Sequence, residues 1–316
     1  MKHRVLITAP YFQPVVQAFR DVFLKNDIEV VVPPVEERLS ASDLLPLISE
    51  IDGAICGDDE YNDEVLEHAK RLRVISKWGT GIDSIDLISC RKRGIKVCNT
   101  TNAFTDAVAD TTVGYILCFT RQLHTLSEQM KAGQWFKVPG RAVRECTIGL
   151  IGIGNIGKAV AKRLTAFGAT MLATDPIQPP ASFLETYPVE MVDKKTLLAR
   201  SDIVSLHCDL NPGSLHVIDA QAIETMRTGA SIINTARGKL IDEPALVRAL
   251  QQKRLSAAAL DVFEDEPLPQ DSPLRSMANV LLSPHNSNSS PEAWQRVHQN
   301  TVDNLIRVLC GVEQTR

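Results

Sequence analysis

Residues 147–157 read T-I-G-L-I-G-I-G-N-I-G, and this stretch decides the fold of the chain. An apolar run at 148–151 leads directly into Gly152-x-Gly154-x-x-Gly157, and a helical pattern at 158–167 follows. A strand before the glycines and a helix after them is the context in which this pattern binds a dinucleotide. The free N–H groups and the dipole of the helix N-terminus then attract the pyrophosphate. The site begins unusually far into the chain.

An acidic residue lies where the second strand of such a site ends. Asp175 follows Gly157 by about 18 residues, close to the spacing of about 20 that dinucleotide sites show. A carboxylate at this place accepts hydrogen bonds from ribose hydroxyls and repels a 2′-phosphate. We therefore predict NAD rather than NADP as the cofactor. The alternative is that Asp175 is a turn residue before Pro176.

Strand-like runs alternate with helical patterns on both sides of residues 147–157. The expected strands are 5–8, 30–32, 53–56, 74–77, 148–151, 170–174, 203–207, 231–234, 257–261 and 280–283. The expected helices are 158–167, 194–199, 219–226 and 243–252, with one long helix at 106–131 and an amphipathic helix at 291–309. This alternation predicts an α/β protein with parallel sheets and crossover helices.

Composition narrows the class of protein. The 316 residues are 44% hydrophobic and 23% charged, with a formal net charge of −4, so no nucleic acid or anionic membrane surface is expected as a partner. No run approaches about 18 apolar residues, so we expect no membrane span. The N-terminal apolar run is too short for a signal peptide. Seven cysteines without a C-x-x-C pair are typical of reduced thiols in a cytoplasmic protein, and no metal site is expected.

Three polar residues follow expected strands and are candidates for catalysis. Arg237 follows the strand at 231–234, Glu266 lies in an acidic cluster after 257–261, and His285 comes directly after 280–283. The carboxyl ends of parallel strands face the ligand crevice of an open sheet. An arginine suits a substrate carboxylate, and a histidine carries protons near neutral pH. Each residue alone could be structural, but the set favours a catalytic site.

These motifs resemble the NAD-dependent D-isomer-specific 2-hydroxyacid dehydrogenases, which include 3-phosphoglycerate dehydrogenases, D-lactate dehydrogenases and hydroxypyruvate/glyoxylate reductases. The resemblance covers nearly the whole chain and is closest to the phosphoglycerate-dehydrogenase-like branch. It rests on G-I-G-N-I-G with Asp175, N-T-A-R-G-K-L-I-D-E-P-A-L at 234–246, A-L-D-V-F-E-D-E-P at 259–267 and S-P-H at 283–285. The stretch K-W-G-T-G-I-D-S-I-D at 77–86 resembles the family's substrate loop.

The resemblance implies two Rossmann-like domains, with the nucleotide domain inserted into a discontinuous substrate domain. The substrate domain would comprise 1–103 and 288–316, and the NAD-binding domain 104–287. The active site would lie in the cleft between them. A homodimer through the nucleotide domain is also implied, for which the 106–131 helix and the arm near Trp135 are the candidate contacts.

The resemblance also assigns roles to residues. Arg237 would bind the carboxylate and carbonyl of a small 2-hydroxy or 2-keto acid, His285 would exchange a proton with the substrate oxygen, and Glu266 would favour the imidazolium form of His285. The implied substrate-binding residues are Trp78, Gly79, Thr80, Gly81 and Arg237. The implied cofactor contacts are Thr80, Gly152, Gly154, Asn155, Ile156, Gly157, Asp175, Cys208, Thr235, Asp261 and His285. Asp261 would lie near the nicotinamide amide.

Two departures from the family's pattern bear on the substrate, and a third is the polar run N-S-N-S at 286–289 after His285, where relatives commonly have small residues. Residues 57–61 read G-D-D-E-Y where phosphoglycerate dehydrogenases tend to carry an arginine, and three carboxylates disfavour an extra phosphate. Trp78 stands where relatives often have a smaller residue, so it either walls the substrate pocket or is a core tryptophan.

Three hypotheses on function remain open. The first is a dehydrogenase for a non-phosphorylated or unusual 2-hydroxy acid, and the second is a 3-phosphoglycerate dehydrogenase. The third, from another class, is an NAD(H)-sensing protein similar to corepressors with this fold. The sequence does not name the substrate side chain, the direction of the reaction, the pathway or the oligomeric state beyond a dimer.

Overall fold

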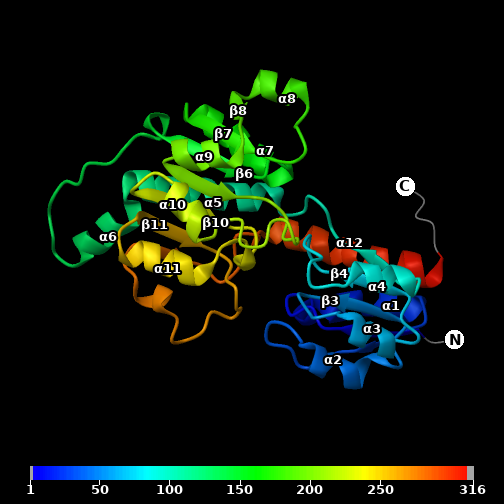
Figure 1. Ribbon diagram of the computed structural model, residues 1–316. Helices are drawn as coiled ribbons and strands as arrows, with labels where there is room; N and C mark the ends of the chain where they lie inside the picture. The colour runs from blue at the N-terminus through cyan, green and yellow to red at the C-terminus, as the bar shows by residue number, and fades with distance from the viewer. Residues whose placement is uncertain (1–2, 312–316) are drawn as a thin grey trace. The chain divides into compact units, whose positions relative to one another are not determined.

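The computed structural model describes residues 3–311, which form two compact units (Figure 1). The first unit contains residues up to Phe104 together with those from Ser290 onward, and the second is Thr105–Ser289. Both units have parallel sheets with helices, so the predicted α/β fold class is confirmed.

The first unit has a five-stranded parallel sheet in the order β2-β1-β3-β4-β5. The strands are β1 His3–Ile7, β2 Ile28–Val31, β3 Gly53–Cys56, β4 Val74–Lys77 and β5 Lys96–Cys98. The helices are η1 Gln13–Phe19, α1 Arg20–Lys25, α2 Ala41–Ile48, α3 Asp63–His68, α4 Leu87–Lys92 and α12 Pro291–Cys310. Strand β5 was not predicted, because a three-residue strand with no fully buried side chain gives little apolar signal.

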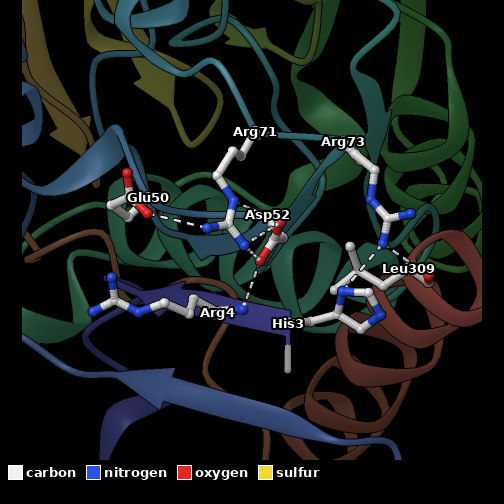
Figure 2. Close-up of polar contacts among 7 residues, drawn as sticks. All are labelled: His3, Arg4, Glu50, Asp52, Arg71, Arg73 and Leu309. Carbon is white, nitrogen blue, oxygen red and sulfur yellow. Dashed lines mark hydrogen bonds and ion pairs between the residues drawn. The ribbon is translucent and has the colours of Figure 1, made fainter. Parts of the chain in front are cut away.

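The end of the chain completes the first unit. Helix α12 packs against β3, β4 and β5, with Leu305 and Leu309 so close to Gly53 that a larger residue there would force them to move (Figure 1). Arg73, next to β4, donates a hydrogen bond of 2.9 Å to the Leu309 carbonyl, as Figure 2 shows. In the same view, Asp52 accepts hydrogen bonds from the Arg4 backbone and the Arg71 guanidinium. The Arg73 bond joins the segment before β4 to the final helix, and the Asp52 bonds join β1 to the segments before β3 and β4.

The second unit has a seven-stranded parallel sheet in the order β12-β11-β10-β9-β6-β7-β8. The strands are β6 Thr147–Ile151, β7 Thr170–Thr174, β8 Val189–Met191, β9 Ile203–Leu206, β10 Ala230–Asn234, β11 Leu255–Leu260 and β12 Val280–Leu282. Its α-helices are α5 Thr105–Arg121, α6 Leu123–Lys131, α7 Asn155–Ala166, α8 Ala181–Thr186, α9 Lys194–Arg200, α10 Ala220–Thr225 and α11 Glu243–Gln251. Short 3-10 helices are η2 Val143–Glu145, η3 Gly238–Leu240 and η4 Pro273–Ser276.

The prediction of one continuous helix at 106–131 is wrong. The helix breaks at Gln122, whose φ of 54° is left-handed, and α5 and α6 lie on either side of it. Helix α5 packs on α7 and buries apolar side chains, whereas α6 buries none. The sequence did not indicate this break, because residue 122 is a glutamine and no glycine or proline lies next to it.

The strand order reverses beside β6 in the second unit. The chain runs outward through β7 and β8 on one side and returns to β9 on the other. The connections that leave the carboxyl ends of β6 and β9 therefore lead in opposite directions along the sheet, and ligands of open α/β sheets bind at such a point. Among residues 3–311, no helix is both long and apolar enough to span a membrane.

Candidate active site

Each glycine of the Gly152–Gly157 turn has its own steric reason. Gly152 has a φ of 99°, and a side chain there would strike the backbone of His207 and Cys208 beyond β9. A side chain on Gly157 would strike the Gly152 carbonyl, so this glycine lets α7 lie close to β6. Gly154 is the N-cap of α7 and has open space around its Cβ position. The turn is therefore closely packed at Gly152 and Gly157 and has open space at Gly154.

Asp175 lies beside this turn, at the end of β7. Its Oδ2 accepts a hydrogen bond of 2.8 Å from the Ile153 backbone, and its Oδ1 accepts one of 2.8 Å from the Ile177 backbone. The carboxylate is thereby fixed next to the first turn of α7. The N-cap residue Gly154 has no side chain to cap α7, which suits a helix N-terminus that binds an anion.

These residues fit a dinucleotide. Gly154 leaves room in front of α7, where Asn155 and Ile156 begin the helix, and Asp175 would supply the carboxylate for the ribose. Cys208 borders the turn through its contact with the Gly152 position, and burial raises the pKa of its thiol to about 11. Thr235 is buried against α5, with its hydroxyl 3.2 Å from that of Thr112.

The turn after β10 presents Arg237. The buried Asn234 side chain donates to the Arg237 carbonyl at 2.8 Å and accepts from the Ala236 backbone at 3.1 Å, which fixes the shape of the turn. Gly238 lies against the Phe263 carbonyl so closely that no side chain fits there. The Arg237 turn and the loop after β11 are thus in direct backbone contact.

His285 and Glu266 form a pair. The His285 Nδ1 lies 3.0 Å from Glu266 Oε2, and both side chains are about one fifth exposed. Glu266 Oε1 accepts a hydrogen bond of 2.9 Å from the Phe263 backbone, which sets the orientation of the carboxylate. His285 has a left-handed φ of 52°. Because Nδ1 faces Glu266, Nε2 is the ring nitrogen directed away from the Glu266 carboxylate.

Asp261 holds the loop that carries His285. Its fully buried carboxylate accepts hydrogen bonds from the backbones of Asn286 and Ser287 at 2.8 and 2.9 Å, and from the Ser287 hydroxyl at 2.5 Å. Its carbonyl accepts a bond of 2.7 Å from the His285 backbone. The sequence predicted a cofactor contact for Asp261 and did not indicate this support of the His285 backbone. The polar run after His285 was the only available signal for it.

Residues 78–81 belong to the first unit, at the carboxyl end of β4. Trp78 is 5% exposed, donates to His298 Nδ1 at 2.9 Å and contacts the rings of Tyr11, Phe104 and Trp294. These contacts agree with the alternative of a core tryptophan. Gly79 has a φ of 128°, and the Thr80 hydroxyl donates to the Thr100 carbonyl at 2.9 Å. Gly81 follows directly, and the predicted substrate contacts of residues 78–81 stay predictions.

The acidic loop after β3 is less negative than its sequence indicates. Asp59 points inward and accepts hydrogen bonds from the Thr8 hydroxyl at 2.6 Å and the Leu39 backbone at 2.7 Å. Burial raises the pKa of Asp59, against the opposing effect of these hydrogen bonds. Asp58 pairs with the buried Lys77 at 2.8 Å. The expected repulsion of a phosphate by three free carboxylates is therefore overestimated.

The seven-stranded sheet with its glycine turn and Asp175 defines a dinucleotide-binding α/β protein. The sequence model of the D-isomer specific 2-hydroxyacid dehydrogenase NAD binding domain matches residues 113–287. The chain is 40% identical over 302 residues to a glyoxylate reductase from Thermofilum pendens, covering 91% of this chain and 87% of that protein. It is 36% identical to a hydroxypyruvate reductase from Thermotoga maritima, covering 98% and 99%.

A solved structure is also similar. The D-lactate dehydrogenase from Aquifex aeolicus, complexed with NAD and lactic acid, superposes with a TM-score of 0.88 at 28% identity, covering 98% of this chain and 96% of that one. The chain belongs to the D-isomer specific 2-hydroxyacid dehydrogenase family. It is an NAD-dependent oxidoreductase that interconverts 2-hydroxy acids and 2-keto acids.

Proposed function

We propose that this enzyme reduces small, non-phosphorylated 2-keto acids such as glyoxylate or hydroxypyruvate. The observation that carries the proposal is the contact between His285 Nδ1 and Glu266 Oε2, next to a loop that packs on the Arg237 turn. The relatives that reduce glyoxylate and hydroxypyruvate support the choice of substrate.

The proposed roles follow from the chemistry of each group. NADH supplies a hydride when bound. Arg237 binds the substrate carboxylate through its planar guanidinium. His285 delivers a proton from Nε2 to the carbonyl oxygen, and Glu266, 3.0 Å from Nδ1, stabilises the imidazolium before that transfer. Asp261 keeps the His285 backbone in its left-handed conformation by bonding the residues that follow.

A 3-phosphoglycerate dehydrogenase is the second candidate. Its support is the internal pairing of the acidic loop, in which Asp59 is buried and Asp58 is neutralised by Lys77. Steady-state oxidation of NADH with glyoxylate, hydroxypyruvate, pyruvate and phosphohydroxypyruvate distinguishes the candidates. We expect the highest kcat/KM with glyoxylate or hydroxypyruvate. A preference for phosphohydroxypyruvate would contradict the first proposal, and no activity with any of the four would contradict both.

We also propose a cytoplasmic homodimer formed through the second unit. All seven cysteines are free, which fits a reducing compartment. Helix α6 buries no residue, and the arm that follows exposes 87% of Trp135 and 51% of Phe136. Leu123 and Met130 of α6 are also about half exposed, and large exposed apolar side chains in one segment are of the kind that a partner covers.

The two units have separate proposed tasks. We assign NAD binding and proton transfer to Thr105–Ser289, because the glycine turn, Arg237, Glu266 and His285 all belong to it. The remainder, up to Phe104 and from Ser290 onward, would recognise the rest of the substrate.

A further inference from the structure

Two glutamates outside the proposed catalytic set exchange hydrogen bonds with each other's backbone. The Glu243 N–H donates to Glu264 Oε1 at 3.0 Å, and the Glu264 N–H donates to Glu243 Oε2 at 3.3 Å. Burial raises the pKa of Glu243, with a further contribution from the nearby Glu264 and Asp265 carboxylates. Holding two acidic side chains together in partly buried positions is unfavourable. Capping of α11 does not explain this arrangement, because Asp242 already caps that helix.

Glu264 also binds a third segment. The His216 Nε2 lies 3.1 Å from Glu264 Oε1, and the His216 backbone, with a left-handed φ of 48°, donates to the Lys239 carbonyl at 2.9 Å. Lys239 lies in η3, two residues after Arg237. The segment before α10, the Arg237 turn and the loop after β11 therefore meet at the Glu264 side chain.

Glu264 connects the two parts of the proposed catalytic set, which are Arg237 and the Glu266–His285 pair. Glu264 is two residues before Glu266, whose carboxylate contacts His285. On the other side, Gly238 packs directly on the Phe263 carbonyl and the Glu264 N–H, immediately after Arg237. A rotation of the 263–266 loop would therefore change the position of Glu266 relative to Arg237.

We propose that Glu264 and Glu243 act as a positioning pair, which fixes the Glu266–His285 pair relative to the Arg237 turn. Neither glutamate is placed against the reacting atoms. The inference rests on the proposed roles of Arg237, Glu266 and His285. The reciprocal hydrogen bonds set the orientation of the loop, and the loop sets the orientation of the Glu266 carboxylate at His285 Nδ1.

The test compares Glu264→Ala, Glu264→Gln and the control Asp265→Ala in steady-state reduction of glyoxylate by NADH. We expect Glu264→Ala to lower kcat by about 10- to 100-fold, because a small displacement of a catalytic group costs that much. NADH affinity should stay unchanged. The alkaline limb of the rate profile should move to lower pH, because a displaced Glu266 stabilises the imidazolium less well. Asp265 is exposed and makes no part of the pair, so its variant should retain wild-type behaviour.

The conservative variant separates positioning from general stability. Glu264→Gln keeps an amide oxygen that can accept from both groups that meet Glu264 Oε1, the Glu243 N–H and the His216 Nε2–H, so we expect most of the activity and the wild-type pH profile. Glu243→Ala should reproduce the loss, and the double alanine variant should lose no more than the worse single variant, since the two act as one unit. Thermal unfolding identifies the folded variants, and Glu243→Ala carries the test if Glu264→Ala does not fold.

Several results would overturn the inference. These are a Glu264→Ala or Glu243→Ala enzyme with wild-type kcat and pH profile, or equal losses in Glu264→Gln and Glu264→Ala. An unchanged pH profile in a slow but folded Glu264→Ala enzyme would also overturn it. A His285→Ala enzyme that retains turnover would instead refute the proposed function. An inactive His285→Ala with an unaffected Glu264→Ala would refute only the positioning pair.

Discussion

The Asp175 carboxylate has a structural role and a proposed role in binding the cofactor ribose. Its two oxygens accept backbone hydrogen bonds from Ile153 and Ile177, so the charge cannot turn away from the glycine turn. A fixed negative charge at this place repels a 2′-phosphate but accepts hydrogen bonds from ribose hydroxyls. We therefore expect a preference for NAD over NADP to depend on this residue.

Replacing Asp175 by alanine should relax the discrimination against NADPH. We expect the ratio of kcat/KM for NADPH to that for NADH to rise at least tenfold, because about 1.4 kcal/mol of charge repulsion corresponds to that factor. NADH binding should weaken as well, since Ile153 loses its acceptor. Glu185→Ala, which removes an exposed carboxylate from α8, is the matched control and should change neither value. A wild-type enzyme that already uses NADPH as well as NADH would contradict this account.

At the level of single residues, some features could be predicted from the sequence and others could not. The glycine pattern and Asp175 could be predicted, because backbone approach and charge depend on residue type. The inward turn of Asp59 could not, because the Thr8 and Leu39 groups that bind it are distant in sequence. The exchange between Glu243 and Glu264 was hidden for the same reason, as these residues lie 21 positions apart.

Elements with a strong apolar pattern were predicted well. Strands β3, β4 and β7 and the start of α11 fall where the sequence placed them, because buried parallel strands are continuous apolar runs. The short strands β5 and β8 were missed, since each has a charged residue among only three and so forms no apolar run, whereas β12, equally short, is wholly apolar and was predicted. The break between α5 and α6 was missed because a left-handed glutamine leaves no mark in the sequence.

The exposed arm after α6 gives a test at the level of elements. Changing Trp135 and Phe136 together to serine should convert the proposed dimer into a monomer, because it removes two large, mostly exposed apolar side chains. Analytical ultracentrifugation measures the change, and Ile88→Ser, at another exposed apolar residue in α4, is the control. A wild-type protein that sediments as a monomer, or a double variant that remains a dimer, would show that this surface is not the interface.

At the scale of the whole molecule, the second unit collects residues from distant segments on one edge of its sheet. Gly152, Asp175, Arg237, Asp261 and His285 follow β6, β7, β10, β11 and β12, respectively. All these strands are parallel, so their carboxyl ends share that edge. The order of motifs in the sequence could therefore predict which residues gather, whereas the hydrogen bonds that hold them required the structure.

Proton transfer by His285 is the central claim, and its most direct measurement is the steady-state rate of NADH oxidation by a His285→Ala enzyme. The substrate is the 2-keto acid that the wild-type enzyme reduces fastest. We expect kcat to fall by about 100- to 10,000-fold, the usual contribution of a positioned general acid. The Kd for NADH should stay near the wild-type value, and His68→Ala, at an exposed histidine of α3, should remain fully active. A His285→Ala enzyme with wild-type kcat would contradict the assignment of His285 as the proton donor.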